Sequence, residues 1–529
     1  MRSSKISSRF SSKLSVSLRI AASVMPLLAA STLGVAATTL LTASPFVRVA
    51  HAQNATLPFV SPMFTDNMVL QRQRPVIVWG WTTPGKTVKA SFDDKNDKNG
   101  KNGKNGKNGK TGSAVADAQG KWVAKLPALP VGGPYTLTIT GSGESQSTTF
   151  KNILSGDVWV CSGQSNMEMG IGNVLNAGDE IASANYPEIR LFTVEKKIST
   201  TPEALCRGKW DVCTPDTVKA GGWNGFSAVG YFFGRELYKN LKVPIGLIHT
   251  SWGGTPAEAW TSAEALQTME DYKSRNPLVP EKHDQNTPTT LYNGMIAPVL
   301  PYGIKGAIWY QGESNAGRAF QYRTLLPTMI KDWRDRWDEG NFPFYIVQLA
   351  NWQQPNPNPV EDQWAELREA QSMTAQHTPN TGIAVTIDIG DAGDIHPKDK
   401  QNVGKRLALA ALAQTYHEKI EFAGPTYKSM KVEGNKIRLT FDHVGGGLVA
   451  KGGDTLKGFA IAGEDKKFAW ADAKIEGNSI VVSSAQVSSP VAVRYAWHIN
   501  PVCNLFNKAD LPASPFRTDT WPGITVNNK

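Results

Sequence analysis

The chain has 529 residues, of which 56 are Lys or Arg and 46 are Asp or Glu, so its formal net charge is +10. This length corresponds to three or four domains at about 150 residues each. A hydrophobic share of 40% excludes wholesale disorder. The basic balance first suggests a nucleic acid or an anionic surface as a partner, and the position of the charges decides whether that suggestion holds.

The first 52 residues carry six basic side chains and no acidic one. An apolar run over residues 20–41 follows the basic start, and Ala50-His51-Ala52 has the pattern of a cleavage site. Together they predict a signal peptide over residues 1–52 and a secreted or periplasmic protein with no membrane association after cleavage. An uncleaved membrane anchor is the alternative, because the apolar run is long enough to span a bilayer.

A second block of charge lies in residues 93–112, which repeat Lys-Asn-Gly and contain six Lys and three Asp. Turn-forming residues at every step predict a solvated hairpin loop. Without the signal peptide and this loop the chain has a net charge near +1. Because no Arg-rich stripe with interleaved aromatic residues remains, no nucleic-acid partner is expected.

Short alternating runs at 76–81, 121–126 and 135–140 are separated by Gly and Pro. This pattern predicts an N-terminal antiparallel β domain over residues 53–155, with the architecture of a sandwich. Strand-like runs return near the end of the chain and predict a C-terminal β region over residues 419–529.

Between these regions, residues 156–418 alternate between apolar runs and helical patterns. Nearly continuous apolar runs, typical of strands buried on both faces, occur at 157–161, 243–250, 304–310, 342–350 and 382–389. Strands that alternate with helices predict an α/β fold with a doubly wound parallel sheet. Ligands bind such sheets beyond the carboxyl ends of the strands, so the loops there are the place to look for chemistry.

The loop after the first of these strands carries a serine in the sequence Gly-Gln-Ser-Asn-Met, residues 163–167. A serine on a strand-to-helix turn can present its hydroxyl while nearby backbone N–H groups face a developing oxyanion. Ser165 is therefore a candidate nucleophile. The turn is not the usual G-x-S-x-G elbow, because Met167 stands in place of the second glycine.

The next two strands are also followed by polar, glycine-containing loops. Gly253 and Gly254 follow one strand and would let the backbone approach a ligand closely. Gln311, Glu313 and Asn315 follow the other, where a side-chain amide could complete an oxyanion hole.

The loop after the last strand contains a histidine among acidic residues. His396 follows Asp391 and Asp394, and a carboxylate on its Nδ1 would fix the tautomer that a general base needs. Together with Ser165 this predicts a serine, aspartate and histidine arrangement for acyl transfer. The sequence has no H-E-x-x-H, P-loop or dinucleotide-binding motif, so neither a metal nor a cofactor is expected.

These segments resemble the sialate O-acetylesterase-like carbohydrate esterases, a branch of the SGNH (GDSL-like) hydrolase superfamily. The motifs that carry the resemblance are GQSNM at 163–167, SWGGTPAEAW at 251–260, WYQGESN at 309–315 and DIHP at 394–397. The resemblance implies a flavodoxin-like three-layer catalytic domain. It also implies metal-independent removal of acetyl esters from sugar hydroxyls through an acetyl-serine intermediate.

Carried over residue by residue, the resemblance makes Ser165 the nucleophile and His396 the base. The oxyanion would be held by the N–H of Ser165, by Gly253 or Gly254, and by Asn315.

Two departures from the superfamily pattern leave alternatives open. The third block usually reads G-x-N-D, which this chain lacks, so Gln311 and Glu313 are alternatives for the role of Asn315. The last block usually reads D-x-x-H, whereas the nearest acid here, Asp394, precedes the histidine by two residues. Asp391 is the second candidate for the acid.

The expected partner is an acetylated oligosaccharide or polysaccharide. The candidates for the substrate cleft are Gln164, Gln311, Glu313 and Trp260. A nearly neutral body does not favour an anionic sugar, so a hemicellulose such as xyloglucan or xylan is at least as plausible as O-acetylated sialic acid. A catalytically silent carbohydrate-binding protein and a serine peptidase are the rival interpretations.

Export would place the four cysteines in an oxidising compartment. Cys206 and Cys213 are close enough in the sequence to pair around a short loop, and a disulfide between them is expected. Cys161 and Cys503 have the pattern of buried single thiols.

Overall fold

The structure is a computed structural model that describes residues 57–93, 110–143 and 146–529. The predicted signal peptide and most of the Lys-Asn-Gly loop lie outside these residues. The chain from Thr56 to Lys529 forms one compact unit. Within the described part of the chain, no helix combines the length and the apolar character needed to cross a membrane.

Five parallel strands form the centre of the fold. They are β7 (Ser147–Gly163), β10 (Ile245–Ser251), β11 (Gly306–Tyr310), β12 (Phe344–Val347) and β13 (Thr381–Ala384). Their order across the sheet is β13-β12-β11-β7-β10, which is the flavodoxin-like order. Every residue of β10, β11 and β12 is buried, because helices cover both faces. The predicted parallel α/β sheet is confirmed.

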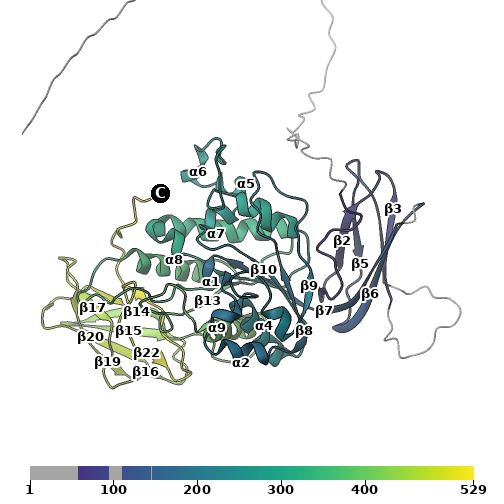
Figure 1. Cartoon of the computed structure of the whole chain (residues 1–529). Coiled ribbons are helices and arrows are strands. Elements are labelled where there is room, and N and C mark those ends of the chain that lie inside the picture. Colours follow the sequence, from purple (N-terminus) through teal and green to yellow (C-terminus); the bar gives the residue numbers. More distant parts are fainter. Residues whose placement is uncertain (1–56, 94–109, 144–145) are drawn as a thin grey trace, which may run out of the picture. The chain divides into compact units, whose positions relative to one another are not determined.

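The long helices form two layers, one on each side of this sheet (Figure 1). One layer contains α4 (Ala228–Leu241) and α9 (Lys400–Gln414), and the other contains α7 (Ala319–Trp337) and α8 (Gln363–His377). Three of these helices begin with a side chain that accepts a backbone N–H in the first turn. These capping residues are Ser227, Asp362 and Asp399.

Shorter elements extend the sheet and form its loops. Beyond β10 lie β8 (Tyr186–Thr193), which is parallel, and β9 (Trp210–Cys213), which is antiparallel to β8. The short helices are α1 (Ser165–Glu168), α2 (Ala177–Ala182), α3 (Pro215–Val218), α5 (Ala263–Leu266) and α6 (Glu270–Lys273).

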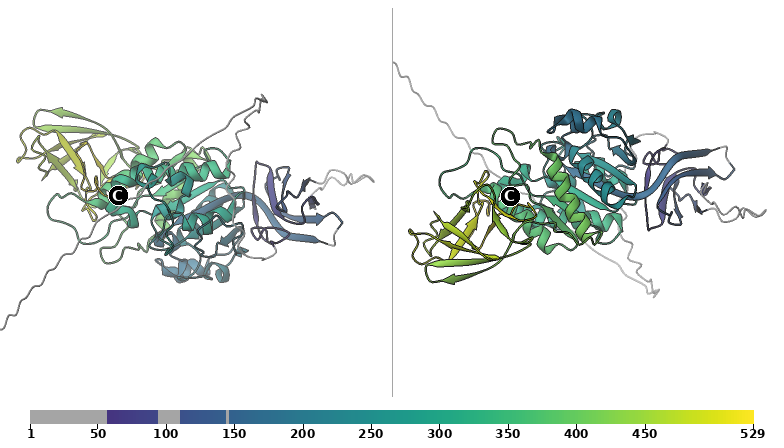
Figure 2. Two further views of the ribbon diagram at one scale, coloured as in Figure 1. Left: turned by 90° about the horizontal axis from the view of Figure 1, so that it is seen from above. Right: turned by 90° about the horizontal axis from the view of Figure 1, so that it is seen from below.

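The N-terminal strands are joined to the central sheet through β7. They are β1 (Val69–Gln71), β2 (Val76–Trp81), β3 (Thr87–Asp93), β4 (Thr111–Val115), β5 (Lys121–Leu126) and β6 (Gly132–Gly141). β6 pairs with the first half of β7, whereas β10 and β11 pair with its second half (Figure 2). The hydrophobic core is accordingly continuous from Met63 to Leu412.

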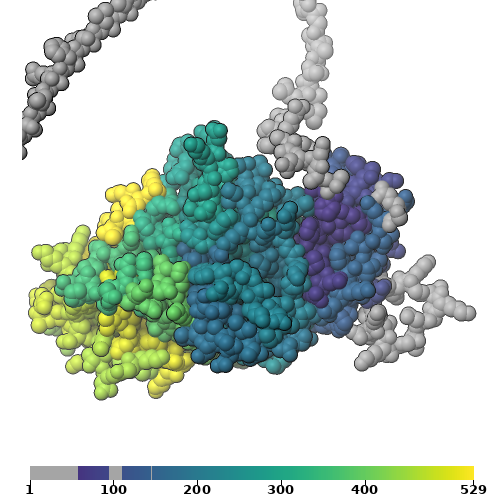
Figure 3. All heavy atoms as spheres, viewed as in Figure 1, coloured from purple at the N-terminus to yellow at the C-terminus, as the bar shows by residue number. Residues whose placement is uncertain are grey.

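The C-terminal strands surround a second, smaller core. They are β14 (Thr426–Glu433), β15 (Lys436–Asp442), β16 (Leu448–Ala450), β17 (Phe459–Ala462), β18 (Ala469–Trp470), β19 (Asp472–Glu476), β20 (Ser479–Ser483), β21 (Ala492–Tyr495), β22 (Leu505–Asn507) and β23 (Phe516–Arg517). The last residues of the chain return to the helices: the N–H of Thr525 donates to Glu366 on α8, and Lys529 pairs with Asp271 on α6 (Figure 3). The division of the chain at residues 155 and 418 remains a prediction.

The predicted disulfide is wrong, because all four cysteines are free thiols. The Cys206 Sγ lies 3.2 Å from the Sδ of Met63, whereas the Cys213 Sγ, at the end of β9, lies 3.8 Å from the carbonyl oxygen of Ala184. The two thiols are thus held in different packing environments. Burial raises the pKa of each to about 12.

A buried carboxylate links three distant parts of the chain. Asp157 on β7 is fully buried and accepts two hydrogen bonds from the Arg72 guanidinium, at 2.9 and 2.8 Å. It also accepts from the Gln71 amide at 3.0 Å and from the Tyr416 hydroxyl at 2.9 Å. The bidentate pair with Arg72 ties the N-terminal strands to the central sheet, and the hydrogen bond from Tyr416 ties the segment after α9 to it.

We expect Asp157→Asn to lower the free energy of unfolding by about 3–5 kcal/mol, because it leaves the Arg72 charge largely buried without a counterion. Asp335→Asn is the matched control, since Asp335 forms an exposed pair with Lys331 that contributes at most about 1 kcal/mol. Denaturant titration measures both values. Equal, small losses for the two variants would show that the Asp157 cluster is not a structural link.

Candidate active site

The registers of the central strands bring three of the predicted loops to one point. Gly163, the last residue of β7, lies opposite Ser251 on β10 and opposite Tyr310 on β11. A Cβ on Gly163 would lie 2.1 Å from the Tyr310 carbonyl oxygen, and its φ of +140° also favours glycine. This tight passage leads directly to Ser165 at the start of α1.

The structure brings Ser165, His396 and Asp394 together in a hydrogen-bonded chain. The Nε2 of His396 lies 3.0 Å from the Ser165 Oγ, and its Nδ1 lies 3.1 Å from the Asp394 Oδ1. The same Asp394 oxygen accepts the backbone N–H of His396 at 2.9 Å, so a tight turn places it on the ring. Asp391 instead accepts the backbone N–H of Gly393. Of the two candidate acids, Asp394 is therefore the one that contacts the histidine ring.

A buried polar cluster holds the histidine loop against α1. The Asn166 side-chain amide donates to the carbonyl oxygen of Ile395 at 3.1 Å and to the Glu313 Oε1 at 2.6 Å. The Asn166 Oδ1 accepts from the Nζ of Lys400 at 2.5 Å. Asn166 follows Ser165 and Ile395 precedes His396, so this cluster fixes the serine and the histidine relative to each other.

The charges of this cluster shift the pKa values of the site. Burial lowers the pKa of Lys400 to about 7, against the attraction of Glu313. Burial raises the pKa of Glu313, against its hydrogen bond from Asn166. The pKa of His396 is lowered chiefly by burial and additionally by the Lys400 charge, while Asp394 opposes the shift. A neutral imidazole is thereby favoured, which is the form that a general base requires.

The predicted glycine lies against the serine, but its N–H is engaged. A Cβ on Gly253 would lie 3.2 Å from the Ser165 Cβ, so only glycine allows this approach without displacement. The N–H of Gly253 donates to the Glu168 Oε2 at 2.7 Å, and Glu168 also pairs with Lys196. Gly254 has a φ of +76° and completes the turn. Glu168 was not among the residues predicted for the site, because its carboxylate belongs to the turn of α1 rather than to a strand end.

Two side chains of the third loop are part of a buried network. The Asn315 amide nitrogen donates to the Glu258 carboxylate at 2.9 Å, and its oxygen accepts from the Gln311 amide at 2.7 Å. The Tyr322 hydroxyl donates to the side-chain oxygen of Gln311. Gln311 is fully buried, so the prediction that it lines the substrate cleft is wrong.

Glu313 and Gln164 form hydrogen bonds with residues of the first and third loops. The Glu313 carboxylate faces Asn166, and its Oε2 is buried without a partner among the described residues. The Gln164 side-chain oxygen accepts the backbone N–H groups of Gly312 at 3.4 Å and Ser314 at 3.3 Å. These contacts join the first and third loops.

The tryptophan that contacts the histidine is not the one predicted for the cleft. Trp260 is fully buried against Trp309, and its indole N–H donates to Thr255, so its predicted place in the cleft is wrong. Trp223 instead is 39% exposed and meets the His396 ring edge-on, with 5.0 Å between ring centroids. Trp252 is half-buried under the Lys196 ammonium. A tryptophan in a turn-rich loop, between Gly222 and Gly225, was the available signal for Trp223.

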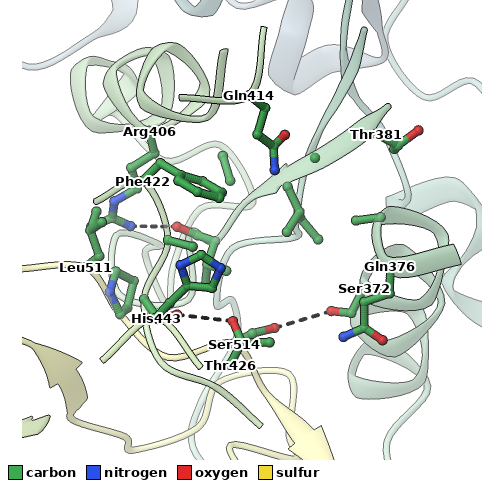
Figure 4. Close-up of a pocket in the computed structure, with 18 residues that line it drawn as sticks. Ser372, Gln376, Thr381, Arg406, Gln414, Phe422, Thr426, His443, Leu511 and Ser514 are labelled. Carbon is green, nitrogen blue, oxygen red and sulfur yellow. Dashed lines mark hydrogen bonds between the residues drawn. The ribbon is translucent and has the colours of Figure 1, made fainter. Parts of the chain in front are cut away.

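A pocket of about 210 Å³ lies away from these residues, between α8, β13, α9 and the C-terminal strands (Figure 4). Arg406 and His443 line it, and Ser372 and Ser514 face each other across a hydrogen bond at its base. Arg406 forms a bidentate pair with Asp388. None of the predicted site residues belongs to it. Among the described residues, no three His, Cys, Asp or Glu side chains gather as a metal site requires.

The chain is similar to known carbohydrate esterases over most of its length. The model of the sialic acid-specific carbohydrate acetylesterases matches residues 155–413. Sialate O-acetylesterases from Mus musculus and Homo sapiens are 31% and 32% identical, over 88% and 87% of this chain and 95% and 93% of theirs. The crystal structure of a carbohydrate acetylesterase from Xanthomonas citri is 40% identical, with a TM-score of 0.77 over 87% of this chain and 99% of that one. The chain therefore belongs to the sialate O-acetylesterase family of carbohydrate esterases and is a carboxylic ester hydrolase.

Proposed function

We propose that this protein is a serine carbohydrate O-acetylesterase that cleaves acetyl esters on sugar hydroxyls through an acetyl-serine intermediate. The observation that carries the proposal is the hydrogen-bonded chain from Ser165 through His396 to Asp394. In that geometry a neutral imidazole accepts the hydroxyl proton while the carboxylate holds the ring in the required tautomer.

In the first half of the reaction, His396 Nε2 takes the proton from the Ser165 Oγ, and the oxygen attacks the acetyl carbonyl carbon. The bond to the sugar oxygen then breaks, and the sugar leaves with the proton from His396. In the second half, water gives its proton to His396 and attacks the acetyl-serine carbonyl. Collapse returns the proton to Ser165 and releases acetate.

The developing oxyanion needs donors on the side of the serine facing the second loop. The N–H of Ser165 is at the first helical position, where no intrahelical acceptor exists. The N–H of Gly253 becomes a second donor once the Glu168 carboxylate withdraws from it. Asn315, which the family resemblance suggests as a third, keeps only the amide hydrogen not donated to Glu258. Each donor in place would lower the barrier by about 3 kcal/mol.

The surroundings of the triad favour an acetylated neutral polysaccharide, such as a hemicellulose, over O-acetylated sialic acid. A sialic acid carboxylate requires a cation, and the two lysines whose contacts place them beside the triad are engaged: Lys400 is buried on Asn166, and Lys196 is paired with Glu168. The exposed ring of Trp223 offers an apolar face for a sugar instead.

The predicted export of the chain agrees with this substrate, because a polysaccharide is met outside the cytoplasm. The location in the periplasm or outside the cell, and the absence of membrane association after cleavage, remain predictions from residues 1–52.

Acetate release is the direct test of function and substrate. We expect the wild type to release acetate from acetylated xyloglucan or xylan faster than from O-acetylated sialic acid. Ser165→Ala should lose at least about 10³-fold in kcat, because it removes the nucleophile. Circular dichroism checks that the variant folds. Acetate release by Ser165→Ala at the wild-type rate would exclude the acetyl-serine route, and preference for sialic acid would overturn the substrate assignment.

The acid limb of the pH profile should reflect the protonation of His396. The base must be neutral, and its pKa is lowered in the folded protein, so kcat/KM should reach half its maximum below the ordinary histidine pKa of about 6.5. The measurement is hydrolysis of a chromogenic acetyl ester from about pH 4 to about pH 9. A limb above the ordinary value would mean that another group limits the rate.

Removal of the buried Lys400 ammonium should shift the acid limb of the pH profile. The Lys400 charge lowers the pKa of His396, so Lys400→Met should raise that pKa and shift the acid limb to higher pH. Lys405→Met, an exposed lysine on the same helix, is the control and should leave the limb in place. A variant that is slower by the same factor at every pH would show that Lys400 acts only through the fold.

A further inference from the structure

A second pocket, of about 190 Å³, lies on the C-terminal strands and contains no residue of the triad. It is formed by the strands β17, β18 and β21 and by residues 359–361, which precede α8. Its aromatic and cationic lining residues are Lys466, Phe468, Trp470, Arg494 and Trp497. Neither the reaction proposed above nor the family match over residues 155–413 accounts for this concentration of rings.

The Trp470 ring is fixed in position and still open to solvent. It is 47% exposed, and its indole N–H donates to the carbonyl oxygen of Pro357 at 2.7 Å. The hydrogen bond at the polar edge holds the ring in place, and its exposed surface lines the pocket, where it is available to stack on a ligand.

The second tryptophan of the pocket is held more deeply than Trp470. Trp497 is 8% exposed, and the guanidinium groups of Arg494 and Arg517 lie over its ring at 5.1 and 5.2 Å from the centroid. Trp497 therefore forms part of the pocket wall, and Trp470 is the tryptophan that a ligand can reach.

The pocket holds charged groups of both signs, and most of them are paired with one another. The Arg494 guanidinium stacks on Phe468 at 4.2 Å, and its charge is balanced by Asp519 and Glu361, at 2.8 and 2.7 Å. Lys466 has its ammonium 5.6 Å above the Trp521 ring and no acidic partner in the described ranges. The pocket therefore combines the exposed Trp470 ring with the Glu361 carboxylate as an acceptor and the Lys466 ammonium as a donor, the kinds of group that recognise a sugar.

We propose that this aromatic pocket is a carbohydrate-binding subsite that holds a non-acetylated stretch of the same neutral polysaccharide whose acetyl group is cleaved at Ser165. The class of ligand follows from the carbohydrate esterase family to which the chain belongs. The choice of a neutral polymer rests on the proposed function, and the test below separates the two.

The pocket is linked to the histidine loop by residues 351–362. At one end the Asn351 side-chain oxygen accepts the Gly390 N–H at 2.7 Å, and Trp352 forms a bridge with Asp391. The other end, residues 359–361, is a wall of the pocket. The intervening residues 352–359 span at most about 25 Å even when fully extended. A polymer held in the pocket would raise the local concentration of acetyl groups at the triad.

Binding to non-acetylated polymers tests the subsite without involving catalysis. We expect the wild type to bind deacetylated xyloglucan or xylan in affinity electrophoresis and calorimetry, and Trp470→Ala to bind about tenfold more weakly. Trp470→Ala should also raise KM for the acetylated polymer while kcat/KM for a small chromogenic acetyl ester stays unchanged. Met430→Ala, which removes an exposed apolar side chain from β14 in the same region, is the matched control and should change neither.

Three results would overturn the proposal. The first is wild-type affinity for the polymer in Trp470→Ala. The second is binding only to an acidic polymer such as polygalacturonate. The third is a dimer that Trp470→Ala dissociates in size-exclusion chromatography without any polysaccharide binding, which would make the pocket a protein interface. None of these depends on acetate release, so the esterase mechanism would remain standing.

Discussion

The parallel registers of β7 with β10 and with β11 are the constraint on which the site depends. Gly163 lies opposite Ser251 on one side and opposite Tyr310 on the other, so three loops leave the sheet at the same level. A slip of one residue would invert the faces of β7 and displace Ser165. Every residue from Ile153 to Gly163 is buried, so each side chain has a packed position on one face, and a slip would place it in the packing of the other face.

The register of these strands does not by itself place His396 beside Ser165. Strands β11 and β12 lie between β7 and β13, so the loop after β13 must cross them to reach Ser165. Asn166 secures that crossing by bonding to the carbonyl oxygen of Ile395 and to the Lys400 Nζ. A buried ammonium is costly in free energy, but it fixes one geometry where an apolar contact would allow several. The Lys400 ammonium also lowers the pKa of His396, the side chain that it helps to position.

The sequence was informative where physical patterns are local. Strands buried on both faces leave continuous apolar runs, and all five were predicted. Asp394 was the first candidate for the acid because it is the acid nearest to His396 in the sequence, and a tight turn brings it to the ring. The direction of individual side chains was not predictable. Trp260 lies in the same motif as Gly253, and Gln311 lies in the same motif as Asn315, yet both side chains are fully buried. Trp223 contacts the His396 ring from a loop that carries no motif. The disulfide failed for the same reason, since a short spacing between cysteines says nothing about which neighbours each thiol packs on.

The charge that first suggested an anionic partner has a different meaning in the folded protein. Much of the excess lies in residues 1–52 and in the Lys-Asn-Gly loop, and the cations near the triad are already paired or buried. The proposed neutral substrate would therefore be bound without charge pairing, and uncharged surfaces would supply its binding free energy. Exposed indole rings are available for this purpose, with Trp223 beside His396 and Trp470 on the C-terminal strands. Because stacking on rings depends little on the identity of a sugar, selectivity has to come from the hydroxyl contacts around the acetyl group.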